Sequence, residues 1–458
     1  MIAMQKSLLI VVIALFSMYS CSRPSLTVPV EGGRVQGIEE TAGVAVFKGI
    51  PYAAPPVGEL RWRDPQPVIP WGGVRKADSF GPIAMQKPQD PSSMYYKEFY
   101  SSGLPEMSED CLYLNVWAPE GSVGNAGAKL PVAMWIHGGA FSGGYGHEIT
   151  MDGTEWARRG VILVTINYRL GFLGFLAYPE LSKEQGGLSG NYGLKDQIVA
   201  LKWIHENIEG FGGDPDNITV MGQSAGGMSV RCLAVCPESK PLMAKAIIQS
   251  AGGLLPENPQ PKAWRGDEYG KFLMDGAGYT SLREMRAAGY EETFDRISPH
   301  VLRLMANIMT EGGSIMDAMI LGPKVDGKTL PEDFDSAVYD DSVADIPYLV
   351  GSVTADGELL GGAGIPRFCA ERNKRSDKGA YAYYFSRELP GDESGAFHSS
   401  ELWYMFGTLD RSWRPFTEAD HALSEKMLDA WTHFCKTGTP GWAPCTEENP
   451  YMETLDTN

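Results

Sequence analysis

The chain is short of positive charge. Its 39 lysine and arginine residues stand against 57 aspartate and glutamate residues, so the formal net charge is −18. A field of this sign repels phosphate backbones and anionic lipid surfaces, which excludes nucleic acid as an expected partner. We interpret the acidic excess as a source of solubility rather than as a means of steering a cationic substrate. The sequence also lacks internal repeats and long low-complexity tracts.

Cysteine is scarce, and its spacing does not suit a metal. No paired C-x-x-C motif occurs. Cys232 and Cys236 are four residues apart, a spacing more typical of packing on one helix face than of a ligand pair. The sequence therefore predicts no metal site, and we expect no cofactor. The seven cysteines are Cys21, Cys111, Cys232, Cys236, Cys369, Cys435 and Cys445.

The apolar run at the N-terminus is short for a membrane-spanning helix. Residues 7–18 are almost wholly apolar and follow a positively charged start, as in a signal peptide. Ser20 and Cys21 then resemble a bacterial lipoprotein processing site, although Met18 and Tyr19 depart from its usual pattern. We expect residues 1–20 to be removed and Cys21 to be acylated, in a secreted protein or a cell-envelope lipoprotein of the periplasm, outer membrane or surface. Secretion without a lipid is the alternative.

The remaining chain has enough hydrophobic residues to form one large core. It is 43% hydrophobic within 458 residues, and its 54 glycines are spread along the chain, as expected for many turns. Single large α/β enzymes reach this size. We therefore expect residues 21–458 to form a single catalytic domain, while the sequence leaves the oligomeric state open.

Short apolar runs separated by helical patterns predict an α/β fold with a mostly parallel sheet covered on both faces. Residues 255–320 have helical spacing without a strong strand signal. We expect them to form a cap at the carboxyl edge of the sheet, where such folds place their active sites. The predicted strands are residues 34–37, 44–49, 112–117, 130–136, 161–168, 218–221, 245–249, 346–350 and 380–385, and helices are predicted at 191–206 and 423–434.

The most informative motif is GQSAG at residues 222–226. It follows the apolar run 218–221 and precedes a segment of small residues that can start a helix. This is the context of a nucleophile elbow, in which a sharp strand-to-helix turn exposes the oxygen of Ser224. Glycine accepts the backbone angles of such a turn at low cost. The new helix would also point its free N–H groups, including that of Ala225, toward an oxyanion.

A serine hydroxyl needs oxyanion donors as well as a base. The sequence HGGAF at residues 137–141 follows a predicted buried strand and matches the glycine-rich oxyanion motif of esterases and lipases. We expect Gly139, Ala140 and Ala225 to form the oxyanion hole. His137 lies inside this motif and is expected to support the loop rather than to act as the base.

The base should follow the acid in the chain. His300 falls in the predicted cap, and His421 and His433 fall on the predicted terminal helix. His398 lies in a loop after a late strand, a placement that suits a catalytic histidine. The acid should precede it, and after the strand ending at residue 350 both Asp356 and Glu358 compete on composition alone.

With these motifs the chain resembles the type-B carboxylesterases, a family that includes para-nitrobenzyl esterases, liver carboxylesterases and cholinesterases. The resemblance covers about residues 30–455 and implies an α/β-hydrolase fold with helices on both faces of the sheet. The matching segments come in family order: FKGIPYA at 47–53, EDCLYLNV at 109–116, the loop at 137–141, NYR at 167–169, GNYGLKDQ at 190–197 and FGGDP at 211–215.

The resemblance implies a triad of Ser224, His398 and Asp356. The family's acid loop ends in Asp-Glu-Gly, and alignment on Gly357 places Asp356 rather than Glu358 at the catalytic position. His398 falls on the family histidine, within GAFHSSEL at residues 395–402. The family also pairs Arg61 with Glu109 and Arg169 with Asp196, which we interpret as ion pairs of the scaffold.

The chain departs from the family at several points. Ala84 stands where the family usually has the cysteine that is joined to Cys111, so Cys111 is expected to be free. No tryptophan occurs between residues 84 and 111, which argues against a choline ester. Gln223 replaces the glutamate often found before the serine. Only 42 residues separate Asp356 from His398, which predicts a shallower and more open site than in cholinesterases.

The sequence therefore predicts a carboxylic ester hydrolase that acts through an acyl-enzyme. A feruloyl or acetyl-sugar esterase, or a lipase, would share this mechanism and differ only in its pocket. The contrasting alternative is a non-catalytic adhesion module of the same fold. Adhesion modules usually lack the serine or the histidine, and here both are present.

Overall fold

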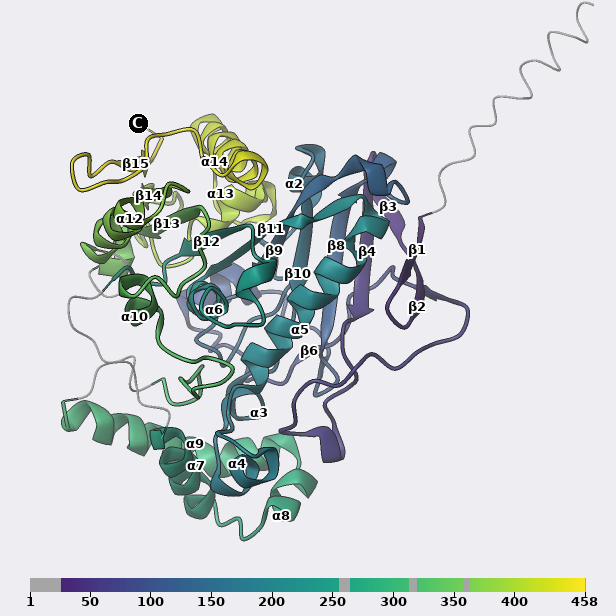
Figure 1. Cartoon of the computed structure of the whole chain (residues 1–458), viewed down its shortest axis with the longest axis vertical. Helices are drawn as coiled ribbons and strands as arrows, with labels where there is room; N and C mark the ends of the chain where they lie inside the picture. The colour runs from purple at the N-terminus through teal and green to yellow at the C-terminus, as the bar shows by residue number, and fades with distance from the viewer. Residues whose placement is uncertain (1–25, 255–263, 313–318, 358–361, 458) are drawn as a thin grey trace, which may run out of the picture.

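The computed structural model describes residues 26–254, 264–312, 319–357 and 362–457. A large twisted sheet runs through the middle of the molecule, with helices on both sides (Figure 1). In spatial order its strands are β15 (Met452–Leu455), β14 (Ala380–Phe385), β13 (Tyr348–Val353), β12 (Lys245–Gln249), β11 (Gly213–Gln223), β9 (Leu130–Ile136), β10 (Ile162–Ile166), β8 (Tyr113–Pro119), β4 (Val44–Pro51) and β3 (Ile38–Thr41).

The sheet is mostly parallel, as the sequence predicted. Neighbouring strands run parallel from β10 through β9 and β11 to β15. Strands β8, β4 and β3 form an antiparallel edge. Every residue of β10 and β12 is buried, because helices cover both faces of the parallel part.

Alternate residues of one strand belong to two different cores. Val132 and Met134 of β9 pack into the core that contains helices α5, α6 and α12. Ala133 and Trp135 pack into the core that contains α2, α13 and α14. The bounds of these helices are α2 (Thr154–Arg158), α5 (Tyr192–Asn207), α6 (Ala225–Leu233), α12 (Gly364–Arg375), α13 (Leu402–Phe406) and α14 (Glu418–Thr437).

Further helices gather below the sheet in the view of Figure 1. Side chains from α3, α4, α7, α8 and α9 share one apolar cluster, which includes Phe172, Leu181, Met274, Met285 and Ile297. Residues 255–263 and 313–318 of the predicted cap lie outside the described residues. The bounds are α3 (Gly171–Phe175), α4 (Pro179–Gln185), α7 (Trp264–Gly276), α8 (Leu282–Ala287) and α9 (Tyr290–Thr310), and α10 (Phe334–Tyr339) follows.

The edges of the sheet differ from the sequence prediction. Strand β11 begins at Gly213, five residues before the predicted start, and β15 and β3 were not predicted at all. Strand β15 is short and only its last residue is buried, so it lacks an apolar run to signal it. Smaller strands, also only partly predicted, are β1 (Thr27–Val30), β2 (Gly33–Gln36), β5 (Val74–Lys76), β6 (Ile83–Ala84) and β7 (Met107–Ser108).

Both predicted ion pairs of the scaffold are confirmed. Arg169 Nη2 lies 2.6 Å from Asp196 Oδ1, and both side chains are buried. Arg61 Nε donates to Glu109 Oε2 at 2.8 Å. The prediction that Cys111 is a free thiol is also confirmed, as it is for every cysteine in the described part of the chain.

The signal peptide and Cys21 lie outside the described residues. Among the helices that are described, none combines the length and the apolar character that crossing a bilayer would require.

Candidate active site

Ser224 stands at the turn between β11 and α6 in a strained conformation. Its φ of 57° and ψ of −124° fall outside the regions that ordinary residues occupy. A Cβ atom at Gly226 would lie 2.0 Å from the carbonyl oxygen of Ile136, and one at Gly222 would lie 2.5 Å from the Gly226 carbonyl carbon. The two glycines are therefore required for strand and helix to approach each other, as the elbow motif predicted.

His398 and Asp356 meet although 42 residues separate them. Asp356 follows β13, and His398 lies in the turn before α13. His398 Nδ1 lies 2.5 Å from Asp356 Oδ1. The second carboxylate oxygen, Oδ2, accepts a hydrogen bond from the Val353 N–H at 3.0 Å, which fixes the side chain. Glu358, the alternative acid, lies outside the described residues.

Asp356 affects both the pKa of His398 and the tautomer of its neutral ring. Burial lowers the pKa of the imidazole, but the hydrogen bond and the negative charge of Asp356 outweigh it, so the pKa of His398 is raised. Because Nδ1 carries the proton that Asp356 accepts, the lone pair of the neutral ring is on Nε2. That nitrogen is the atom that can take a proton from a hydroxyl.

Gln223 rather than Ser224 contacts this nitrogen. The Nε2 atom of His398 lies 3.2 Å from the side-chain nitrogen of Gln223. Within the described residues, the hydroxyl of Ser224 makes no hydrogen bond to His398. A triad mechanism requires His398 Nε2 to contact the Ser224 hydroxyl. In the structure this nitrogen instead contacts Gln223, the residue that precedes Ser224 in the chain.

The glycine-rich loop after β9 presents unused backbone donors. Gly139 has a φ of 101° and Ala140 a φ of 52°. A tight turn holds this shape, because the Gly139 carbonyl accepts hydrogen bonds from the N–H groups of Ser142 and Gly143 at 2.9 and 3.0 Å. Neither the Gly139 nor the Ala140 N–H donates a hydrogen bond within the described part of the chain. The Ala225 N–H is the first of α6 and has no partner inside that helix.

His137 packs against this loop. Its ring is buried and stacks on Tyr168 with ring centroids 4.5 Å apart. Its Nδ1 lies 2.9 Å from the Gly138 carbonyl oxygen. Burial lowers the pKa of His137 to about 4, so the ring is neutral at pH 7.

The other candidate histidines lie elsewhere. His300 is on α9, with its ring against Phe272. His421 and His433 are both on α14, and His421 lies 3.6 Å from Asp410. None of the three contacts Asp356 in the described structure.

The structure adds Glu401 and Tyr95, to which the sequence assigned no role. Glu401 is buried three residues after His398, and burial together with the charge of Asp356 raises its pKa to about 7. Its Oε1 accepts a hydrogen bond from Gln249 at 3.3 Å. The Tyr95 hydroxyl donates to the His398 carbonyl at 3.2 Å. The only signal for Glu401 was its place in GAFHSSEL, and Tyr95 had none.

The described residues contain no group of three or more His, Cys, Asp or Glu side chains that could hold a metal ion. The chemistry available here is that of a serine, an imidazole, a carboxylate and backbone amides.

Solved structures share this architecture. A thermophilic PNB esterase superposes with a TM-score of 0.81 at 30% identity, over 95% of this chain and 96% of that one. A carboxylesterase from Geobacillus stearothermophilus superposes with a TM-score of 0.75, also at 30% identity, over 94% and 96% of the two chains. The fold is that of the α/β-hydrolases, as the sequence predicted.

The model of the carboxylesterase family matches residues 24–366 and 362–458, so the chain belongs to this family and is an enzyme, a carboxylesterase. It is 34% identical to the para-nitrobenzyl esterase of Bacillus subtilis (strain 168), over 93% of this chain and 92% of the relative. It is 38% identical to a fumonisin B1 esterase of Sphingopyxis macrogoltabida, over 74% and 57%. It is 31% identical to the bile salt-activated lipase of Homo sapiens, over 92% and 65%.

Proposed function

We propose that this enzyme hydrolyses carboxylic esters with Ser224, His398 and Asp356 through an acyl-enzyme intermediate. The observation that carries the proposal is the 2.5 Å contact between His398 Nδ1 and Asp356 Oδ1 beside the strained serine elbow. These groups come from three separate parts of the chain, and an imidazole held in this tautomer is what an esterase triad requires.

In the first half of the reaction, His398 Nε2 takes the proton of Ser224 as Oγ attacks the ester carbonyl. The N–H groups of Gly139, Ala140 and Ala225 stabilise the oxyanion, each by about 3 kcal/mol. His398 then protonates the leaving alcohol. In the second half, water attacks the acyl-enzyme with His398 again as the base, and the free acid leaves.

Gln223 contacts the nitrogen of His398 that has to accept the proton of Ser224. In the resting enzyme its amide nitrogen contacts His398 Nε2 at 3.2 Å. The Ser224 hydroxyl has to replace that contact before it can transfer its proton. Ser224 directly follows Gln223 in the chain, and its side chain is only half-buried.

Replacing the nucleophile tests the proposal directly. Ser224→Ala should lower kcat for 4-nitrophenyl butyrate by at least about 10³-fold, because no other group can form the acyl-enzyme. A fluorophosphonate probe should label Ser224 in the unaltered protein, as read by peptide mass spectrometry. The exposed Ser101→Ala variant serves as the control and should keep its activity. Full turnover by a folded Ser224→Ala protein would refute the mechanism.

The substrate range of the relatives does not select one ester. Their names cover para-nitrobenzyl esters, fumonisin B1 and bile-salt-dependent lipid hydrolysis. A feruloyl or acetyl-sugar esterase and a lipase are therefore further candidates with the same triad. A panel of 4-nitrophenyl acyl esters, feruloyl esters and acetylated sugars would separate these activities by kcat/KM.

We also infer that the protein is exported and that its mature chain begins at Cys21. The support is the apolar run of residues 7–18 followed by Ser20 and Cys21. An acyl anchor on Cys21 would then hold the enzyme at a bacterial membrane surface.

A further inference from the structure

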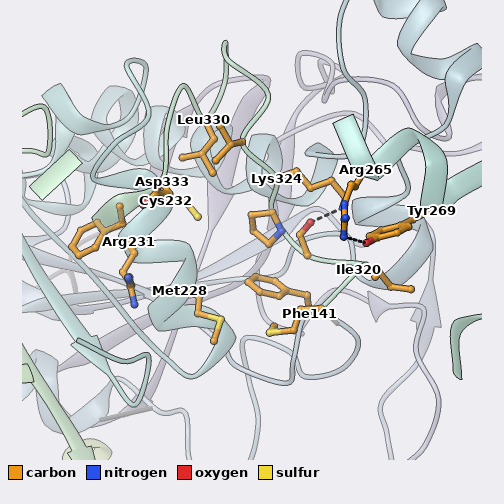
Figure 2. Close-up of a pocket in the computed structure, with 16 residues that line it drawn as sticks. Phe141, Met228, Arg231, Cys232, Arg265, Tyr269, Ile320, Lys324, Leu330 and Asp333 are labelled. Carbon is orange, nitrogen blue, oxygen red and sulfur yellow. Dashed lines mark hydrogen bonds between the residues drawn. The ribbon is translucent and has the colours of Figure 1, made fainter. Parts of the chain in front are cut away.

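A pocket adjoins the oxyanion loop and helix α6, and it is drawn in Figure 2. The cavity has a volume of about 90 Å³ and is partly open to solvent. Phe141 on its wall directly follows Ala140 of the oxyanion loop. Met228 on its wall lies one helical turn after Ser224, to whose carbonyl its N–H donates at 2.9 Å. The pocket therefore lies next to the oxyanion loop and the first turns of α6, although Ser224 and His398 are not among its lining residues.

The pocket carries a concentration of positive charge in an acidic protein. Its described lining includes three cationic side chains, Arg231, Arg265 and Lys324, but only one acidic side chain, Asp333. Asp333 accepts hydrogen bonds from Ser336 at the start of α10, and within the described residues it forms no ion pair with these cations. The whole chain, by contrast, has a net charge of −18.

The three cations differ in their partners. Arg231 forms an ion pair with Asp335 and donates to the Ala251 carbonyl at 2.8 Å. Arg265 donates to the Tyr269 hydroxyl at 3.2 Å, a contact visible at the right of Figure 2. Lys324 forms no ion pair with a carboxylate within the described residues.

Lys324 is held in place by neutral acceptors. Its Nζ donates to the carbonyl oxygens of Phe175 and Gly322 at 2.9 and 2.8 Å. Burial lowers the pKa of this ammonium to about 7, and no neighbouring negative charge opposes the effect. An ammonium has three donors, so one N–H remains beyond the two that the carbonyls accept. An anion that enters the pocket would stabilise the charged form of Lys324, because this ammonium is desolvated and has no carboxylate partner within the described residues.

The rest of the lining is apolar. Phe141, Met228, Ile320, Val325 and Leu330 form much of its wall. Such a surface accommodates a hydrocarbon chain, while Lys324 provides a charged partner for its end. A plain aliphatic ester would leave the ammonium without an anion.

We propose that the preferred substrates are esters that carry a carboxylate, and that this carboxylate binds Lys324 in the pocket beside the oxyanion loop. The proposal rests on the proposed esterase function and specifies the substrate class of that site. Lys324 acts as a specificity residue, because it contacts a distant end of the substrate and takes no part in the proton transfers.

The test compares two esters of equal chain length, 4-nitrophenyl hexanoate and mono-4-nitrophenyl adipate, which differ by a terminal carboxylate. Lys324→Met should lower kcat/KM for the adipate ester by at least about tenfold, mainly through KM, since a hydrogen bond to a charged group is lost. The hexanoate ester should change less than about threefold. Lys324→Gln, which keeps a hydrogen-bond donor but no charge, should behave in the same way.

Lys328→Met is the matched control, because Lys328 is an exposed lysine in the same segment. It should leave the ratio of the two kcat/KM values unchanged. An equal loss for both esters in Lys324→Met and Lys324→Gln, or no loss for either, would exclude a carboxylate on the acyl side of the ester bond.

A second pair of esters shows on which side of the ester bond the carboxylate lies. Phenyl hexanoate and 4-(hexanoyloxy)benzoate differ by a carboxylate on the leaving group. Dependence on Lys324 in either pair supports the proposal, and dependence in neither pair refutes it.

A binding experiment separates this proposal from the triad. Monoethyl adipate should bind Ser224→Ala protein, as measured by calorimetry, and binding should weaken at least about tenfold when Lys324→Met is added. If the unaltered enzyme cleaves no ester, the proposed function fails while this measurement still decides the role of Lys324. Equal binding to both proteins would remove that role.

Discussion

At the residue scale, Gln223 decides what the free nitrogen of His398 contacts. Its side-chain nitrogen is 3.2 Å from Nε2. The sequence singled out Gln223 as a lost negative charge beside the nucleophile. The structure shows that this position borders the imidazole itself, so the identity of the side chain bears on the pKa of the base.

Restoring the charge should move the pH profile. In Gln223→Glu a carboxylate would face His398 Nε2 and stabilise the imidazolium, which raises the pKa of His398 further. The proposed base acts in its neutral form, so the acid limb of kcat/KM should move to higher pH. The profile measured with 4-nitrophenyl butyrate tests this. Gln66→Glu adds the same charge at an exposed position and should not move it; an unmoved profile in Gln223→Glu would contradict the assignment of the base.

Glu401 should make stability depend on pH. Its pKa is raised to about 7 from the ordinary 4.5 by burial and by Asp356. The folded state therefore favours the protonated acid, so the contribution of Glu401 to stability is largest below about pH 4.5 and is lost as pH rises through about 7. The penalty at pH 8 is about 3 kcal/mol at most.

Glu401→Gln should remove this penalty. Urea unfolding should show a variant that is more stable than the unaltered enzyme at pH 8 and nearly equal to it at pH 4.5. The exposed Glu448→Gln is the matched control and should show no such difference between the two pH values. A variant that is destabilised equally at both would mean that the carboxylate is needed for its contacts rather than tolerated.

At the scale of elements, the turn from β11 to α6 depends on the absence of side chains. Gly226→Ala would place a Cβ 2.0 Å from the Ile136 carbonyl oxygen, so strand β9 or helix α6 must move. We expect a loss of more than about 2 kcal/mol in the free energy of unfolding, together with loss of esterase activity. Gly187→Ala is the control, because no atom lies within 4 Å of its added Cβ. Near-native stability and activity in Gly226→Ala would show that the turn has room to relax.

The sequence predicted strands from continuous apolar runs, such as residues 130–136, and from alternating patterns, such as residues 380–385. Residues 130–136, 245–249 and 380–385 match β9, β12 and β14 at both ends. Every residue of β12 is buried between helices on both faces of the sheet, whereas Tyr381 and Tyr384 of β14 are half-buried. Strand β15 was missed because its four residues have no such run, and only its pairing with β14 makes it a strand.

At the scale of the whole molecule, the proposed export and anchoring depend on residues 1–21, which precede the described residues. In a bacterium that processes lipoproteins, the full chain should take up labelled palmitate and sediment with membranes. Cys21→Ala should abolish both while leaving esterase activity intact, because Cys21 precedes the described domain. Ser22→Ala is the neighbouring control and should stay labelled. A soluble, unlabelled protein from the unaltered chain would instead indicate secretion without a lipid.

The sequence by itself determined the fold class, the carboxylesterase family and the candidate triad, because these depend on local patterns: apolar runs, glycines at a tight turn, and motifs in a set order. It left open whether Asp356 reaches His398, and only the tertiary structure brought the two together across β13, β14 and the loop before α13. The tertiary structure alone also showed that the Gln223 amide contacts His398 Nε2 and that Lys324 lies beside the oxyanion loop. Such contacts join segments far apart in the chain, and their distances follow from packing, which no local pattern specifies.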